Sequence, residues 1–147
     1  MLLVITTASY SQIKRIIQPN RKEIGKITPG GVWAIECEKM LDSYYFTYKD
    51  VSFTTIEVRK TFKIEDIDNA FETFYAILAE GFDTVPKEPI ILEFPEGYLY
   101  LYYERVVGMP VVSIRHITSK HEYAPTGFTQ QFTQKQIDRL FGKTKKD

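Results

Sequence analysis

Residues 90–117 read IILEFPEGYLYLYYERVVGMPVVSIRHI, and this stretch decides the fold class. Apolar side chains occupy every second position of residues 90–94, which is the period of a β-strand with one buried face. Two groups of turn-forming residues follow, at 95–97 (PEG) and at 107–110 (VGMP), and their lengths suit hairpin connections. The stretch therefore predicts an antiparallel meander of three strands, over residues 90–94, 98–106 and 111–117.

Residues 64–80, IEDIDNAFETFYAILAE, have a helical period instead. At about 100° per residue the apolar side chains gather within one arc: Ile67, Phe71, Phe74 and Leu78. Acidic side chains occupy the opposite arc or the first turn, where the helix dipole favours negative charge: Glu65, Asp68 and Glu72. Gly81 stands where a left-handed glycine commonly ends a helix. We therefore expect a long amphipathic helix over residues 64–80.

Shorter patterns indicate further strands and two short helices. Alternating apolar residues predict two more strands, around residues 33–37 and 44–48. Two capping-box patterns predict a short helix near each of the N- and C-termini: Ser9 with Gln12, and Thr133 with Gln136. Residues 19–31 contain two prolines and three glycines, which is typical of a loop. The sequence thus predicts one α+β domain over residues 1–147, with a mainly antiparallel sheet of about six or seven strands.

The composition is that of an ordinary globular protein. Of 147 residues, 44% are hydrophobic and 26% are charged, which excludes a disordered chain or a collagen-like repeat. A single cysteine, Cys37, excludes a disulfide scaffold and fits a reducing compartment. The apolar run at residues 2–5 is shorter than the roughly 7–15 residues of a secretory signal core, and no run approaches the roughly 18 residues of a membrane span. We expect a cytoplasmic protein that makes no membrane contact.

The zero net charge conceals an uneven distribution along the chain. Residues 1–30 hold five basic residues and one acid, and the last fourteen residues hold five basic and two acidic residues. Residues 31–110 hold seven basic and fifteen acidic residues, a net charge of −8. Such a negative field attracts basic partners and raises their association rate. The alternative is a charged face that only keeps the protein in solution.

Few residues are candidates for catalysis. His116 lies near the end of a predicted strand and His121 in the following loop, so the pair could act as acid and base on a phosphodiester, or bind a metal with Glu122. Their spacing fixes no shared geometry, and one structural and one solvated histidine is the alternative. Cys37 lies on the apolar side of a predicted strand, which favours a buried thiol over a nucleophile. We predict no catalytic residue, no metal and no cofactor.

Tyr98, Tyr100 and Tyr102 share one face of the predicted strand 98–106. If Leu99 and Leu101 face the core, the tyrosines form a ladder on the opposite surface. Such a ladder can anchor a protein partner or stack nucleobases, and it can also be covered by other elements. Nucleic acid is the less favoured ligand, because the acidic middle of the chain repels phosphates.

Three classes of function remain. The first is a non-enzymatic protein-binding module that captures a basic partner, of the kind that neutralises a nuclease toxin as an immunity protein or antitoxin does. The second is a small-molecule-binding domain with an aromatic-lined pocket between sheet and helix. The third is a phosphodiesterase or ribonuclease that uses His116 and His121. We favour the first class, with six candidate partner-binding residues: Glu65, Asp68, Glu72, Tyr98, Tyr100 and Tyr102.

Overall fold

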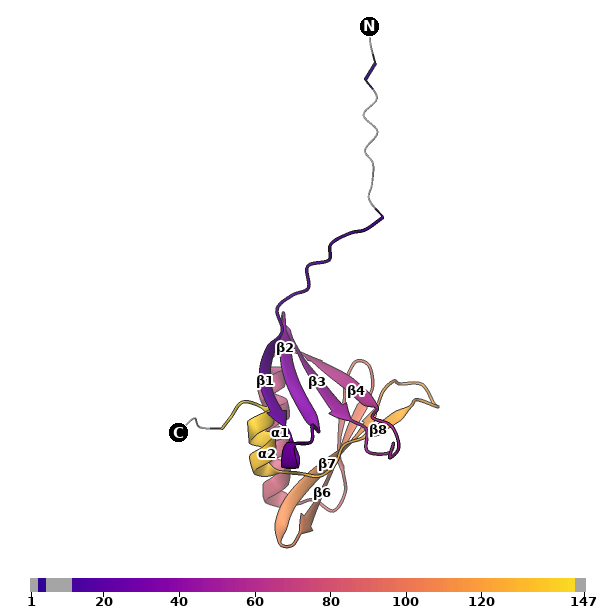
Figure 1. Ribbon diagram of the computed structural model, residues 1–147. Helices are drawn as coiled ribbons and strands as arrows, with labels where there is room; N and C mark the ends of the chain where they lie inside the picture. Colours follow the sequence, from indigo (N-terminus) through magenta and orange to yellow (C-terminus); the bar gives the residue numbers. More distant parts are fainter. Residues whose placement is uncertain (1–2, 5–11, 145–147) are drawn as a thin grey trace.

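The computed structural model describes residues 3–4 and 12–144, and it consists of two antiparallel sheets and two α-helices (Figure 1). The first sheet has the strand order β1-β2-β3-β4: β1 Lys22–Ile27, β2 Ile35–Met40, β3 Ser43–Lys49 and β4 Arg59–Glu65. The second sheet has the order β5-β6-β7-β8, with β9 also paired to β7: β5 Ile90–Glu93, β6 Tyr98–Val106, β7 Met109–Ile117, β8 Thr126–Phe128 and β9 Phe132–Thr133. The helices are α1 Ala70–Thr84 and α2 Gln134–Leu140. The predicted α+β class is confirmed.

The predicted meander is confirmed as β5, β6 and β7. Tyr98 pairs with Ile117 and Val106 with Met109, so β6 and β7 are matched along nine residues. Leu99 and Leu101 are fully buried, as the alternation requires. The turn between β5 and β6 needs Gly97, because a Cβ atom there would overlap the carbonyl oxygen of Ile117.

The long helix begins at Ala70 rather than at residue 64. Residues 59–65 pair with β3 as strand β4, so a strand takes the start of the predicted helix. Asp68 and Asn69 then adopt left-handed φ angles of 53° and 62°, which turn the chain from β4 into α1. Asn69 makes no side-chain cap, and the Asp66 carboxylate accepts the Phe71 amide instead. Three predicted core positions are confirmed as buried: Phe71, Phe74 and Leu78.

Gly81 does not end the helix. The helix continues to Thr84, and the left-handed residue at its C-terminus is Val85, with a φ of 41°. Gly81 lies inside α1 and is buried, because the Tyr103 ring of β6 packs against its Cα atom. The hydroxyl of Tyr103 donates a hydrogen bond of 2.8 Å to the carbonyl oxygen of Leu78 in the same helix. This glycine is required by packing and not by a left-handed turn.

The N-terminal helix that the sequence predicted does not form over the described residues. Residues 12–21 are not helical and lead away from the body of the protein, while Ser9 lies outside the described residues (Figure 1). Ile16 and Ile17, which would follow Gln12 in that helix, are instead 83% and 85% exposed. Part of the predicted loop 19–31 is instead the edge strand β1, which the expectation of six or seven strands also missed. The described residues contain nine strands.

One core connects both sheets and both helices. α1 packs against β4, β6 and β7, and α2 packs against β1, β2 and β7. The ring of Phe46 in β3 lies near the middle, within 6.4 Å of four other phenylalanine rings: Phe62, Phe71, Phe74 and Phe141. The capping box of Thr133 and Gln136 is confirmed at the start of α2. Among the described residues, no helix has the length and apolar character needed to cross a membrane.

Candidate functional site

A surface groove lies between α1 and β5. It consists of two adjoining hollows of about 330 Å³ and 380 Å³, which share Ile67, Ala70, Glu93 and Phe94. We call it the α1–β5 groove. Its apolar lining includes Ile67 and Ile77 on one side and Ile91 and Phe94 on the other. Its charged lining residues are Lys63, Glu65, Asp68, Glu93 and Glu96.

Local geometry explains why apolar side chains reach the surface here. The left-handed turn at Asp68 and Asn69 places Ile67 outside the helix, so its side chain is 62% exposed instead of packing in the core. In β5, strand alternation turns Ile91 outward, and it is 56% exposed. Both strands that border the groove, β4 and β5, are edge strands, and among the described residues each pairs with one neighbouring strand. The groove therefore combines exposed apolar side chains with two strand edges.

The rim of the groove is acidic. Its lining contains four carboxylates and one lysine, Lys63. The Lys63 ammonium lies 3.4 Å from the Glu65 carboxylate. Glu93 is paired with Lys120, at 2.7 Å, which approaches from the loop after β7. Within the described part of the chain, Asp68 and Glu96 have no ion-pair partner. The groove thus offers two exposed carboxylates, those of Asp68 and Glu96, beside an apolar floor.

The tyrosine ladder lies on the outer face of the second sheet. Tyr102 is 38% exposed, and its ring stacks on that of Tyr100 with the centroids 6.5 Å apart. Two cations lie over this face: the Arg115 guanidinium is 5.7 Å from the Tyr100 ring, and the Lys120 ammonium is 5.7 Å from the Tyr98 ring. These cations reduce the negative character that the acidic middle of the sequence suggests for this surface.

The structure brings together five of the six predicted partner-binding residues. Glu65 and Asp68 line the groove, while strand β5 connects the groove to the tyrosine ladder. In that connection Ile91 pairs with Tyr100 and Glu93 pairs with Tyr98. Glu72 is the exception, because its carboxylate binds the Lys143 ammonium at 2.6 Å, near the end of α2.

Two of the acidic groove residues were missed by the sequence analysis, as was the exposure of two isoleucines. Glu93 and Glu96 belong to a strand end and a turn, where acidic residues are common and carry no periodic signal. The available signal for Ile91 was the alternation in residues 90–94, which leaves this residue on the face opposite Ile90, Leu92 and Phe94. Ile67 was assigned to the buried face because the helix was expected to begin before it. Helix period alone could not reveal its exposure.

The two histidines lie in different environments. His116 is buried, and its Nδ1 is 2.8 Å from the Tyr48 hydroxyl. Burial, with a contribution from the Lys60 ammonium, lowers the pKa of His116 to about 4. His121 lies in an exposed loop, and no contact joins the two rings within the described residues. These residues also contain no group of three or more His, Cys, Asp or Glu side chains able to hold a metal ion.

Cys37 is buried in β2, as its alternation pattern predicted. Burial, with a smaller contribution from Glu38, raises the pKa of the thiol to about 12, so the reactive thiolate is scarce at neutral pH.

A scan of protein-family models gave no match to this chain, and comparison with curated proteins and with solved structures gave none either.

Proposed function

We propose that this protein is a non-enzymatic binding module that captures a basic protein partner through the α1–β5 groove and the adjoining tyrosine ladder. One observation carries the proposal: exposed Ile67 and Ile91 lie in a groove lined by four carboxylates and one lysine. Contiguous apolar surface with a polar rim is typical of protein interaction sites. The complementary ligand is a segment that carries apolar side chains flanked by Lys or Arg.

The two parts of the surface would contribute differently to binding. Carboxylates on the rim attract a basic partner over long distance and set the rate of association. Buried aromatic and aliphatic anchors set the lifetime of a complex, because they form the desolvated centre where most binding energy concentrates. Asp68 and Glu96 would serve the first role. Tyr100 and Ile91, which pair across β5 and β6, would serve the second.

A nuclease toxin is the class of partner that fits best by charge. Nucleases bind phosphates through basic clefts, and an acidic protein surface can occupy such a cleft. The protein would then act as a neutralising inhibitor of the immunity or antitoxin type. This assignment follows from charge complementarity alone.

A small-molecule ligand is the second candidate. Each hollow of the groove, at about 330 Å³ and 380 Å³, falls within the roughly 300–1,000 Å³ of small-molecule sites. An aromatic or cationic compound would match the apolar floor and acidic rim. A phosphodiesterase reaction by His116 and His121 has no comparable geometric support, because one ring is buried against Tyr48 and the other lies in an exposed loop.

The proposal is tested by affinity capture from the source cells, with wild-type protein and the variant Asp68→Lys/Glu96→Lys as baits. The matched control is Glu80→Lys/Glu88→Lys, which makes the same charge change at exposed positions outside the groove lining. We expect a basic protein that binds the wild type and the control but not the groove variant.

Surface plasmon resonance with the captured protein then separates the two contributions. The groove variant should lower the association rate by about tenfold at low salt, and Tyr100→Ala should mainly raise the dissociation rate. Equal binding to both charge variants, or association that does not depend on salt, would refute the groove as the site. A small molecule that copurifies with the wild type and is lost from the groove variant would favour the second candidate.

A further inference from the structure

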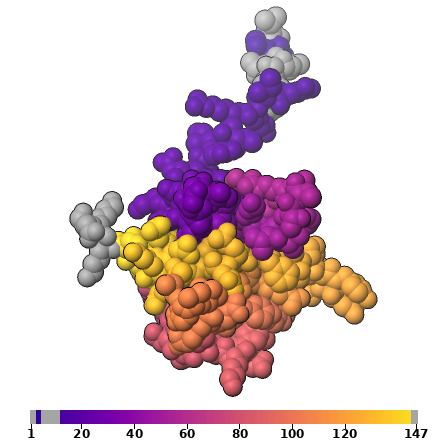
Figure 2. Space-filling model, turned by 60° about the horizontal axis from the view of Figure 1, so that its bottom comes forward, coloured from indigo at the N-terminus to yellow at the C-terminus, as the bar shows by residue number. Residues whose placement is uncertain are grey.

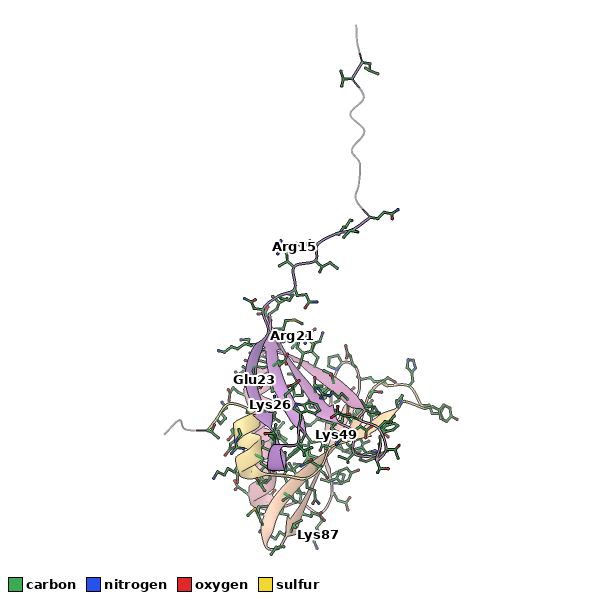
Figure 3. The ribbon with its side chains drawn as sticks, viewed as in Figure 1. Arg15, Arg21, Glu23, Lys26, Lys49 and Lys87 are labelled. Atoms are coloured by element: carbon green, nitrogen blue, oxygen red, sulfur yellow. The ribbon has the colours of Figure 1, made fainter. Side chains whose placement is uncertain are left out.

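The residues before β1 have the composition that the α1–β5 groove is expected to bind. We call residues 12–21 the N-terminal arm; it is extended and projects from the body (Figure 2). Ile16 and Ile17 are 83% and 85% exposed and directly follow Lys14 and Arg15. Arg15 lies far along the arm from the body (Figure 3). Adjacent exposed isoleucines between basic residues are unusual in a free surface and indicate an interaction segment.

We propose that the N-terminal arm is an intramolecular ligand of the α1–β5 groove, which it occupies until a partner displaces it. In this complex Ile16 and Ile17 of the arm cover Ile67 and Ile91. Lys14 and Arg15 meet the carboxylates of Asp68 and Glu96. The docking of the arm rests on the complementary charges and the exposed apolar side chains of the arm and the groove. Displacement by a partner rests in addition on the proposed function.

The arm leaves the body at the end of the sheet where the groove begins. In the strand register Lys22 pairs with Lys39, Lys39 pairs with Tyr44, and Tyr44 pairs with Ile64, which lines the groove. Three strand spacings of about 4.8 Å place the base of the arm about 14 Å from Ile64.

The arm is long enough to close this gap. The six residue steps from Ile16 to Lys22 span about 20 Å when extended, which exceeds the distance to the edge of β4. A short tether gives an effective concentration on the order of millimolar, so docking within one chain is favoured over docking on a second copy.

The base of the arm has a neighbouring acidic site that must be distinguished from the groove. Arg21 lies 3.6 Å from Glu38, and both line a shallow hollow with Glu36 on the first sheet. This hollow could hold the basic residues of the arm, but it lacks the exposed isoleucines that the groove provides. A test must therefore locate the arm and not only detect its charge.

Paramagnetic relaxation enhancement on the full chain locates the arm. A spin label attached to Gln12→Cys marks it, and buried Cys37 does not compete for the label because its thiolate is scarce. We expect broadening of the amide signals of Ile67, Ile91 and Phe94. The variant Asp68→Lys/Glu96→Lys should remove this broadening, and Glu80→Lys/Glu88→Lys should keep it.

Three results would overturn the inference. Broadening confined to Glu36 and Glu38 would place the arm on the first sheet, and no broadening of the body would leave the arm undocked. In a mixture of spin-labelled chains with isotope-labelled, spin-free chains, equally strong broadening of the groove amides would make the ligand a second copy.

A second variant separates this inference from the proposed function. Lys14→Glu/Arg15→Glu should release the arm and return the groove amides to their undocked signals, whereas Lys22→Glu/Lys26→Glu, on β1, should not. With a captured partner, the arm variant should associate faster than the wild type. If the arm docks but no partner is captured, the proposed function fails and the docking stands. If a partner binds the groove and the label shows no docking, this inference alone fails.

Discussion

His116 and Tyr48 form a polar pair inside a mainly apolar core. The Tyr48 hydroxyl is 2.8 Å from His116 Nδ1, and the His116 ring also contacts Phe62 edge-on. Burial lowers the pKa of His116 to about 4 and raises that of Tyr48, so both side chains are neutral at pH 7. At the scale of single residues, this pair links β3 of the first sheet to β7 of the second.

The neutral state of His116 makes stability depend on pH. In the unfolded chain the pKa is 6.5, so between pH 6.5 and about 4 the unfolded state binds a proton that the folded state does not. Stability therefore falls as the pH is lowered through this range, by about 2 kcal/mol between roughly pH 7.5 and pH 5. His116→Asn, which keeps a hydrogen-bonding group near Tyr48, should flatten this slope in urea unfolding measured at both pH values.

The exposed position His121 supplies the control. His121→Asn makes the same chemical change in a loop and should leave the slope of the wild-type protein in place. An unchanged slope in His116→Asn would show that other groups carry the pH dependence of folding in this range.

At the scale of elements, the helical period of α1 determines its buried face, and tertiary packing determines where the helix begins and ends. The period correctly predicted the buried face, which includes Phe71 and Phe74. The period predicted both ends of the helix wrongly. Residues 64 and 65 pair with β3 as part of a strand. At the other end, Gly81 packs against Tyr103 and the helix continues beyond it. Helix propensity per residue is small, so contacts with β4 and β6 decide where the helix begins and ends.

At Gly81 we expect an alanine substitution to destabilise the protein, although alanine has the higher helix propensity. Gly81→Ala in a free helix would stabilise by roughly 1 kcal/mol. Here the added methyl group would overlap the Tyr103 ring, so we expect a loss of about 2 kcal/mol or more in the free energy of unfolding. Urea denaturation measures the change, and combining it with Tyr103→Leu should recover part of the loss. Stabilisation by Gly81→Ala would contradict the packing seen between α1 and β6.

At the scale of the whole molecule, Asp50 joins the two sheets. Its side chain is fully buried after β3, where it accepts the Phe128 amide of β8 and pairs with the Lys60 ammonium of β4 at 2.8 Å. Lys60 in turn donates to the Thr126 carbonyl oxygen of β8, at 2.9 Å. Burial alone would raise the pKa of Asp50, but hydrogen bonds from Lys60, Ser52 and Phe128 outweigh it and lower the pKa to about 2.

Removing this charge should loosen the connection between the sheets. Asp50→Asn leaves Lys60 without its carboxylate partner, and we expect a loss of about 3 kcal/mol in the free energy of unfolding. Amide hydrogen exchange should increase first in β8, whose backbone Asp50 holds. The exposed Asp42→Asn is the control, with an expected change within about 0.5 kcal/mol. An unaffected β8 would show that other contacts hold the two sheets together.

The acid stability of the protein should reflect the same group. Because the pKa of Asp50 is lowered from 3.8 to about 2, its stabilising effect is fully present above pH 3.8 and is lost as the pH falls toward 2. The stability that depends on Asp50 is therefore lost at a lower pH than the stability that depends on His116. Asp50→Asn should remove the lower component of an acid unfolding curve and keep the upper one.

Sequence alone determined the features that depend on neighbouring residues. Alternation in residues 90–117 predicted the meander and the inward side chains Leu99 and Leu101, and the capping box at Thr133 predicted α2. These patterns are local, because a strand or helix face is defined by residues two to four positions apart. The α+β class followed from them.

Tertiary structure decided the features that depend on pairing between distant segments. β1 has few apolar residues and becomes a strand because it pairs with β2. Residues 64 and 65, which the helical period assigned to the helix, belong to β4 because they pair with β3. The α1–β5 groove arises only when Ile67, in the turn between β4 and α1, is brought beside Ile91 of β5. Such pairings are selected by the free energy of the whole fold, and no local period in the sequence encodes them.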